Sequence, residues 1–182
     1  MFTQPPMLWY NQKKFELFIP KSQINLIVEE LACRINKDYQ GKKPVFLLVL
    51  KGSIFFASDL LRKVSLDCVV ETVSANSYGA YMKSSGEVNL ILTKLDITGK
   101  EVIIVEDIID TGLTISKLIE NLKLFNPESV EVVALLSKPG MRKVKVNVKY
   151  IGKEIPSRFV IGYGLDYSEH GRNLPSIYAL SE

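Results

Sequence analysis

Hydrophobic residues are arranged along this chain either in short continuous runs or at helical spacing. Val45–Leu50, Glu101–Val105 and Val130–Leu136 are almost entirely apolar, which is typical of strands covered on both faces. After Ser22 the apolar residues instead recur every three or four positions as far as Ile35, which predicts a helix with Ser22 as its N-cap. The chain therefore combines buried strands with amphipathic helices.

The segments between these runs predict further elements of both kinds. Ser53 and Thr114 each precede residues with helical spacing, and Asp67–Val73 and Val88–Thr93 have the length and composition of strands. Ser74–Gly86 is polar, contains glycine and lacks periodicity, so we predict a loop that is long enough to act as a lid. Strands that alternate with helices indicate an α/β fold with a mostly parallel central sheet flanked by helices.

The C-terminal third of the chain has weaker patterns. In Lys138–Lys149 lysines alternate with valines, which predicts an edge strand with one exposed polar face. From Val148 onward the sequence favours short strands and turns and contains no long helical pattern. No nucleophile motif of a hydrolase triad accompanies His170, the only histidine, so we predict a surface position for it.

The composition is that of one globular domain. The 182 residues are 47% hydrophobic, enough for a sizeable core, and 24% charged. A net charge of +3 without a block of like charges argues against a nucleic-acid partner. The apolar runs are too short to span a membrane and no secretory signal is visible, so we expect no membrane association. Cys33 and Cys68 form no CxxC or zinc pattern, so we interpret them as buried thiols in a cytoplasmic, reducing compartment.

Candidate chemistry is concentrated directly after the strand Glu101–Val105. Glu106 and Asp107 follow the strand, and Asp110 precedes a loop of threonine and glycine that leads into the helix at Thr114. In open parallel sheets ligands bind outside the carboxyl ends of the strands, and backbone N–H groups at a helix N-terminus can hold a phosphate. Neighbouring acids can hold sugar hydroxyls or, through magnesium, a pyrophosphate. The segment therefore predicts a ribose 5-phosphate site, the alternative being an ordinary turn with solvated acids.

The sequence VEDIIDTG at Val105–Gly112 resembles the signature with which type I phosphoribosyltransferases bind 5-phosphoribosyl-1-pyrophosphate (PRPP). More narrowly, it is similar to that of the hypoxanthine-guanine phosphoribosyltransferases. Further blocks follow the order of this family, at Leu50–Gly52 for the pyrophosphate loop, at Ser77 and Tyr78 for a mobile lid, at Lys138, and from Phe159 to Pro175. Together the blocks span most of the chain, from about Val45 to Pro175.

The resemblance implies a role for each residue of the signature. Glu106 and Asp107 would bind the ribose hydroxyls and a magnesium ion, Mg²⁺, and Asp110 would be the catalytic residue that exchanges a proton with purine N7. The 5′-phosphate would lie on the loop of Thr111, Gly112, Leu113 and Thr114, although some relatives carry lysine in place of Leu113.

Residues outside the signature would hold the pyrophosphate and the base. For pyrophosphate the resemblance implies Lys51, Gly52 and Arg172. Around the purine it implies that Lys138 would donate to O6 and that Phe159 would stack on the base. Val160 would meet the edge of the base through backbone atoms, and Asp166 would hold a second magnesium ion. In the proteins that this loop resembles the Leu50–Lys51 peptide bond can be cis, the alternative being an ordinary tight turn with a trans bond.

The function implied by the resemblance is purine salvage. The enzyme would transfer the 5-phosphoribosyl group of PRPP to N9 of a 6-oxopurine base, hypoxanthine or guanine, and release IMP or GMP with pyrophosphate. It would form a homodimer or homotetramer. The single domain would consist of a core at about residues 22–150 and a small hood built from the chain termini, residues 1–21 and 151–182.

A regulator of the same fold that senses nucleotides and binds RNA is the alternative. Its best candidate for a basic surface is Lys138–Lys149. The presence of Lys138, Phe159 and Asp166 together favours the enzyme. An NTP-driven kinase is disfavoured, because the chain lacks the glycine-rich Walker motif.

Overall fold

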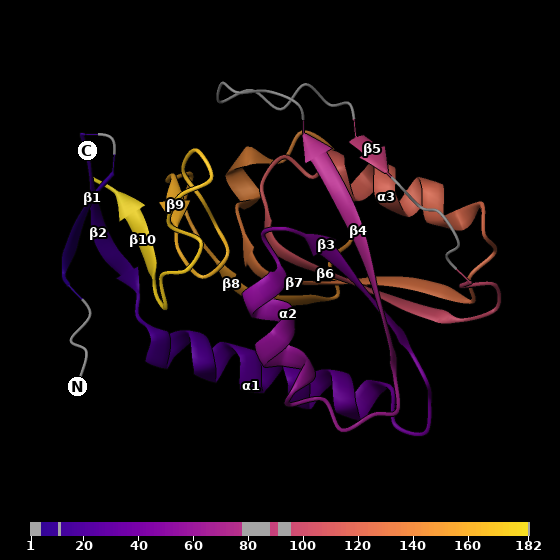
Figure 1. Ribbon diagram of the computed structural model, residues 1–182. Helices are drawn as coiled ribbons and strands as arrows, with labels where there is room; N and C mark the ends of the chain where they lie inside the picture. The colour runs from indigo at the N-terminus through magenta and orange to yellow at the C-terminus, as the bar shows by residue number, and fades with distance from the viewer. Residues whose placement is uncertain (1–4, 11, 78–87, 91–95, 182) are drawn as a thin grey trace.

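The computed structural model describes residues 5–10, 12–77, 88–90 and 96–181. Six of the described strands form the larger sheet, in the order β5-β4-β3-β6-β7-β8 (Figure 1). Neighbours from β4 to β8 are parallel, and β5 adds one antiparallel pair at the edge, so the predicted parallel α/β sheet is confirmed. The strands are β3 (Val45–Leu50), β4 (Val69–Ser77), β5 (Val88–Leu90), β6 (Glu101–Ile109), β7 (Ser129–Ser137) and β8 (Tyr150–Glu154).

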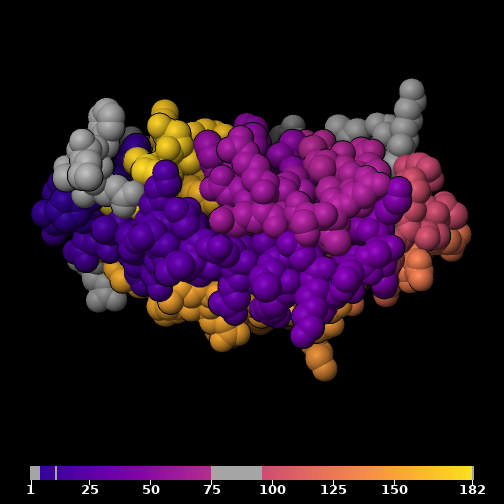
Figure 2. All heavy atoms as spheres, turned by 90° about the horizontal axis from the view of Figure 1, so that it is seen from below, coloured from indigo at the N-terminus to yellow at the C-terminus, as the bar shows by residue number. Residues whose placement is uncertain are grey.

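Helices cover both faces of this sheet. Successive side chains of β3 point to opposite faces, so Phe46 packs in the cluster that contains α1 (Lys21–Asp38) and α2 (Ile54–Leu61), whereas Leu47 packs in the cluster that contains α3 (Leu113–Lys123). The view in Figure 2 shows that α1, α2 and neighbouring N-terminal residues cover most of one face. Because both faces are covered, the strands contain continuous apolar runs rather than an alternating pattern.

The two ends of the chain meet in a second, antiparallel sheet, which we call the hood. Its order is β1-β2-β10-β9, and Phe15 of β2 and Tyr178 of β10 are buried in its core. The first and last of the described strands, β1 and β10, lie at this end of the molecule (Figure 1). β8 pairs with β7, so the larger sheet extends past the expected boundary near residue 150. The hood strands are β1 (Met7–Tyr10), β2 (Lys13–Ile19), β9 (Val160–Ile161) and β10 (Ile177–Leu180).

Three predicted element boundaries are wrong. α1 begins at Lys21 after Pro20 and has no side-chain cap, so Ser22 lies inside the helix instead of capping it. β6 continues beyond Val105, because its pairing with β7 runs as far as Ile109. β4 extends to Ser77, so the first residues of the predicted loop belong to a strand paired with β5.

The segment Lys138–Lys149 is not an edge strand. It begins with a 3₁₀ turn, η1 (Pro139–Met141), and continues as irregular chain. Its side chains do alternate between exposed and half-buried, because Val146 and Val148 pack beside α3.

The prediction that both cysteines are buried is also wrong, since Cys33 is exposed and Cys68 only half-buried. His170 is exposed, as predicted. In the described part of the chain no helix has the length and apolar character needed to cross a membrane.

Candidate active site

The end of β3 turns sharply into α2 at Lys51 and Gly52. The Leu50–Lys51 peptide bond is cis, so of the two alternatives the tight turn with a trans bond is excluded. Ser53 precedes α2, and its buried hydroxyl donates to the carbonyl of Val49 at 2.7 Å. A Cβ atom on Gly52 would lie 1.9 Å from Oδ2 of Asp107, so only glycine lets this turn pack against that carboxylate.

A cavity of about 190 Å³ opens at the carboxyl ends of β3 and β6. Residues that the family resemblance assigned to the pyrophosphate, the ribose and the 5′-phosphate of PRPP lie together around this cavity. Its lining includes Lys51, Gly52, Glu106, Asp107, Thr114 and Arg172. A second hollow of about 300 Å³ lies at the start of β7, lined by Lys123 and residues 126–130, and contains none of the predicted site residues.

The acids of the cavity lie within β6, where Asp107 is buried and Glu106 is half-buried. Burial, and then repulsion from Asp107, raise the pKa of Glu106 well above its usual range. Burial also raises the pKa of Asp107 to about 6, although this carboxylate accepts a hydrogen bond from the N–H of Ile108 at 2.8 Å. Oε2 of Glu106 is buried and has no hydrogen-bond partner among the residues that the structure describes. Both carboxylates are therefore suited to bind hydroxyl donors or a cation that a ligand would bring.

Asp110 and Lys138 meet at the ends of β6 and β7. Nζ of Lys138 lies 3.4 Å from Oδ2 of Asp110, and the lysine side chain is only 10% exposed. Within the described part of the chain, Oδ1 of Asp110 is buried and has no hydrogen-bond partner. The pair therefore presents an ammonium donor beside a carboxylate acceptor, the two groups expected to face O6 and N7 of a purine.

The loop after Asp110 leads directly into α3. Gly112 has φ of +82° and is the N-cap, but no side chain caps the helix. The N–H of Leu113 has only a long contact, 3.4 Å, to Oγ1 of Thr111. Thr114 lies in the first helical turn and lines the cavity. N–H groups at an uncapped helix N-terminus favour an anion such as phosphate.

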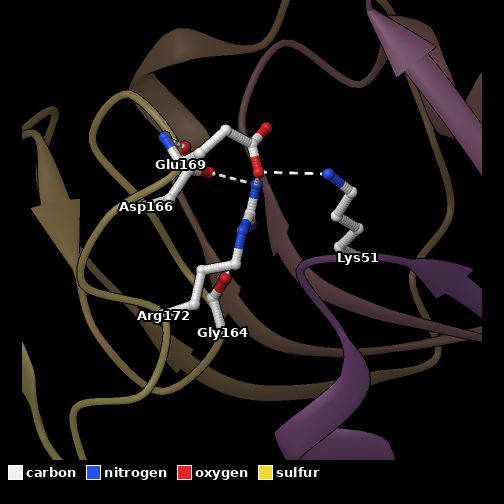
Figure 3. Close-up of polar contacts among 5 residues, drawn as sticks. All are labelled: Lys51, Gly164, Asp166, Glu169 and Arg172. Carbon is white, nitrogen blue, oxygen red and sulfur yellow. Dashed lines mark hydrogen bonds and ion pairs between the residues drawn. The ribbon is translucent and has the colours of Figure 1, made fainter.

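Arg172 is held against the opposite wall by the loop that follows β9. Nη1 donates to the carbonyl of Gly164 at 2.8 Å, and Nη2 lies 2.7 Å from Oδ1 of Asp166 and 3.3 Å from Oε2 of Glu169 (Figure 3). The same Oε2 atom lies 3.2 Å from Nζ of Lys51. The two cations assigned to pyrophosphate therefore share one carboxylate.

Phe159 and Val160 come from the hood. Phe159 is 36% exposed and packs edge-to-face on Tyr167, with ring centroids 5.7 Å apart. Val160 is buried and lies in β9, where its backbone pairs with β10. An aromatic ring that is partly exposed and held by another ring is suited to stacking on a flat ligand.

Comparison with known proteins identifies the family. A family model described as a phosphoribosyl transferase domain matches residues 20–168. A hypoxanthine-guanine phosphoribosyltransferase of Staphylococcus aureus is 42% identical over 166 residues, which cover 91% of this chain and 93% of the relative. This chain belongs to the hypoxanthine-guanine phosphoribosyltransferase family. A relative from Aquifex aeolicus with the same name is 38% identical over 172 residues, 93% of this chain and 97% of the relative.

Solved structures of this phosphoribosyltransferase family share the fold. A hypoxanthine-guanine phosphoribosyltransferase from Bacillus anthracis has a TM-score of 0.85 at 41% identity, over 91% of this chain and 98% of that one. A hypoxanthine phosphoribosyltransferase from Staphylococcus aureus has the same TM-score and identity, over 91% of both chains. The fold prediction is thus confirmed, hood included.

Magnesium, the ion expected in a phosphoribosyltransferase of this family, was assigned to Glu106, Asp107 and Asp166. No group of three or more potential ligands forms among the described residues. Both oxygens of Asp166 are already engaged, one by Arg172 and one by the N–H of Glu169. Mg²⁺ is commonly held by one or two carboxylates together with substrate phosphates, and the unpartnered oxygen of Glu106 beside Asp107 fits that mode.

Two parts of the site were not found by sequence reasoning. The phosphoribosyltransferase signature gave no role to Glu169. The signal that could have found this residue is its negative charge three positions before Arg172. Tyr167, which supports Phe159, was quoted only as part of a block. Of the predicted lid residues, Ser77 ends β4 and Tyr78 lies outside the described residues.

Proposed function

We propose that this enzyme transfers the 5-phosphoribosyl group of PRPP to N9 of hypoxanthine or guanine, with IMP or GMP and pyrophosphate as products. The observation that carries the proposal is the buried Lys138 ammonium beside the carboxylate of Asp110. An ammonium only donates hydrogen bonds, so it suits the O6 acceptor of a 6-oxopurine and opposes the amino group of adenine. The names of the relatives support the same substrates.

PRPP would lie across the ends of the strands. Its 5′-phosphate would accept hydrogen bonds from the Thr111–Thr114 loop, including Leu113, and its ribose hydroxyls would bind Glu106 and Asp107. Lys51 and Arg172, with the backbone at Gly52, would neutralise the pyrophosphate. Fixing the ribose between two anchored groups brings its C1 to the base at low entropic cost.

The base would be held between core and hood. Phe159 would stack on the ring and Val160 would contact its edge through backbone atoms. As N9 bonds to C1 of the ribose, the C1–O bond breaks and pyrophosphate leaves with the electron pair. Asp110 would take the proton from N7, and Lys138 would stabilise the negative charge that develops on O6.

Magnesium belongs to this proposal. Glu106 and Asp107 would hold one ion together with the ligand, and Asp166 a second one if it shares its oxygens with Arg172. When bound, the ion supplies positive charge that makes pyrophosphate a better leaving group. A cytoplasmic location and a homodimer or homotetramer remain predictions, as do the closing lid and the division into core and hood.

An RNA-binding regulator is not supported. The relatives are transferases, and both end lysines of the basic segment Lys138–Lys149 lie beside carboxylates. Lys138 pairs with Asp110, and Lys149 lies 3.4 Å from Asp38 and over the ring of Tyr150. The lysines at the two ends of this segment are therefore already paired with carboxylates of the protein.

Replacing the base-reading lysine tests the proposal. In Lys138→Gln the amide can both donate and accept, so we expect the preference for hypoxanthine over adenine to fall about 10- to 100-fold, as expected for one charged hydrogen bond. Rates of pyrophosphate release with each base measure it. Lys145→Gln, an exposed position in the same segment, is the matched control. An unchanged preference in Lys138→Gln would remove Lys138 from base recognition.

A further inference from the structure

The carboxylate of Glu169 occupies the place between the two cations assigned to pyrophosphate. Its Oε2 atom lies 3.2 Å from Nζ of Lys51 and 3.3 Å from Nη2 of Arg172 (Figure 3). Lys51 comes from the turn after β3 and Arg172 from the loop after β9, so Glu169 joins opposite walls of the cleft. A carboxylate and a pyrophosphate both offer these cations negatively charged oxygen atoms that accept hydrogen bonds.

The backbone around Glu169 is not explained by turn stability. Ser168 and Glu169 have φ of +52° and +66°, in a tight turn closed by hydrogen bonds between Tyr167 and His170. Glycine or asparagine is favoured at such positions, and a glutamate there is disfavoured. The N–H of Glu169 donates to Oδ2 of Asp166 at 2.8 Å, which fixes the turn from which the side chain reaches Lys51.

Glu169 is also the partner that Arg172 can most readily lose. Arg172 has closer contacts to Gly164 and Asp166, at 2.8 and 2.7 Å, and these remain if Glu169 moves away. The side chains of Glu169 and Lys51 are 65% and 71% exposed. Ion pairs that exposed are weak, so an arriving polyanion can displace the carboxylate at little cost.

We propose that Glu169 is a positioning residue of the pyrophosphate subsite, an internal counter-ion that holds Lys51 and Arg172 until pyrophosphate displaces it. The inference rests on the proposed function. The carboxylate competes with pyrophosphate for the same two cations, and it pairs with them again as pyrophosphate leaves. A surface ion pair without a role in binding would have no such effect.

Pyrophosphate binding by calorimetry, with magnesium and without base, tests the proposal. In Glu169→Gln the competing charge is gone, so we expect the dissociation constant of pyrophosphate to fall about two- to fivefold, in keeping with the strength of exposed ion pairs. The difference should shrink at high salt. KM for PRPP should fall with it, while kcat does not rise. A residue that only supports the fold would not tighten ligand binding.

Two further variants make the test specific. Glu169→Gly suits the turn better and also removes the charge, so it should tighten pyrophosphate binding as Glu169→Gln does. Glu30→Gln removes one charge from an exposed site on α1 and should leave binding unchanged. Unchanged or weaker binding in both Glu169 variants would overturn the proposal. If the unmodified protein binds no pyrophosphate, the proposed function fails first, and the inference fails with it.

Discussion

At the scale of single residues, the site depends on charges that have few partners inside the protein. Among the described residues, Glu106 and Asp110 each keep a buried carboxylate oxygen without a hydrogen-bond partner, which is costly unless a ligand satisfies it. The sequence predicted these acids because they follow a buried strand in a recognisable order. It did not predict the contact of Glu169 with Lys51, since that contact needs a turn at positive φ and a residue 118 positions away.

Asp110→Asn is expected to lower kcat by about 10²- to 10⁴-fold, because an amide cannot accept a proton and general base catalysis typically contributes that much. KM for PRPP should change by only a few-fold. Steady-state rates with hypoxanthine measure both values, and Asp96→Asn, at an exposed position, is the control. A variant with near-normal kcat would exclude Asp110 as the general base.

At the scale of elements, the strand ends decide where the chemistry lies. The apolar runs located β3, β6 and β7 correctly, because strands covered on both faces leave a clear signal. They could not show that β6 continues to Ile109, since pairing with β7, and not local composition, extends it through the acids. Similarly, Ala75–Ser77 look like a loop in sequence but become strand by pairing with β5.

Gly52→Ala is expected to disturb the turn between β3 and α2. The added Cβ would lie 1.9 Å from Oδ2 of Asp107, so the carboxylate or the turn must shift, at a cost of about 1–3 kcal/mol in the free energy of unfolding. Pyrophosphate affinity should fall as well. Chemical denaturation measures the stability; Gly140→Ala, whose Cβ would lie 3.5 Å from its nearest neighbour, should be close to unchanged. Equal stability of the two variants would contradict the packing argument.

At the scale of the whole molecule, stability and function oppose each other. The core sheet buries acids at the edge where it meets the hood, and burial raises the pKa of Asp107 to about 6. The folded protein therefore holds this proton more tightly than the unfolded chain does. The protonated Asp107 carboxyl therefore contributes to the stability of the fold. This contribution is fully present below about pH 4 and is lost as the pH rises through about 6.

Asp107→Asn should remove this dependence. At pH 7, in metal-free buffer, we expect the variant to be more stable by about 2–3 kcal/mol, because each pH unit between the two pKa values corresponds to about 1.36 kcal/mol. At pH 3.5 the two proteins should be about equally stable. Urea denaturation at both pH values measures the difference, and a variant less stable than the unmodified protein at pH 7 would show that Asp107 stabilises the fold. PRPP binding should weaken in the same variant.

The most direct test of the account is a competition among bases. The unmodified enzyme is incubated with PRPP, magnesium and equal amounts of hypoxanthine, guanine and adenine, and the nucleotides formed are separated and identified by mass. The account predicts IMP, GMP or both, with one pyrophosphate per nucleotide, little or no AMP, and loss of the products when a chelator removes magnesium. AMP at a level equal to IMP, or no nucleotide at all, would contradict it.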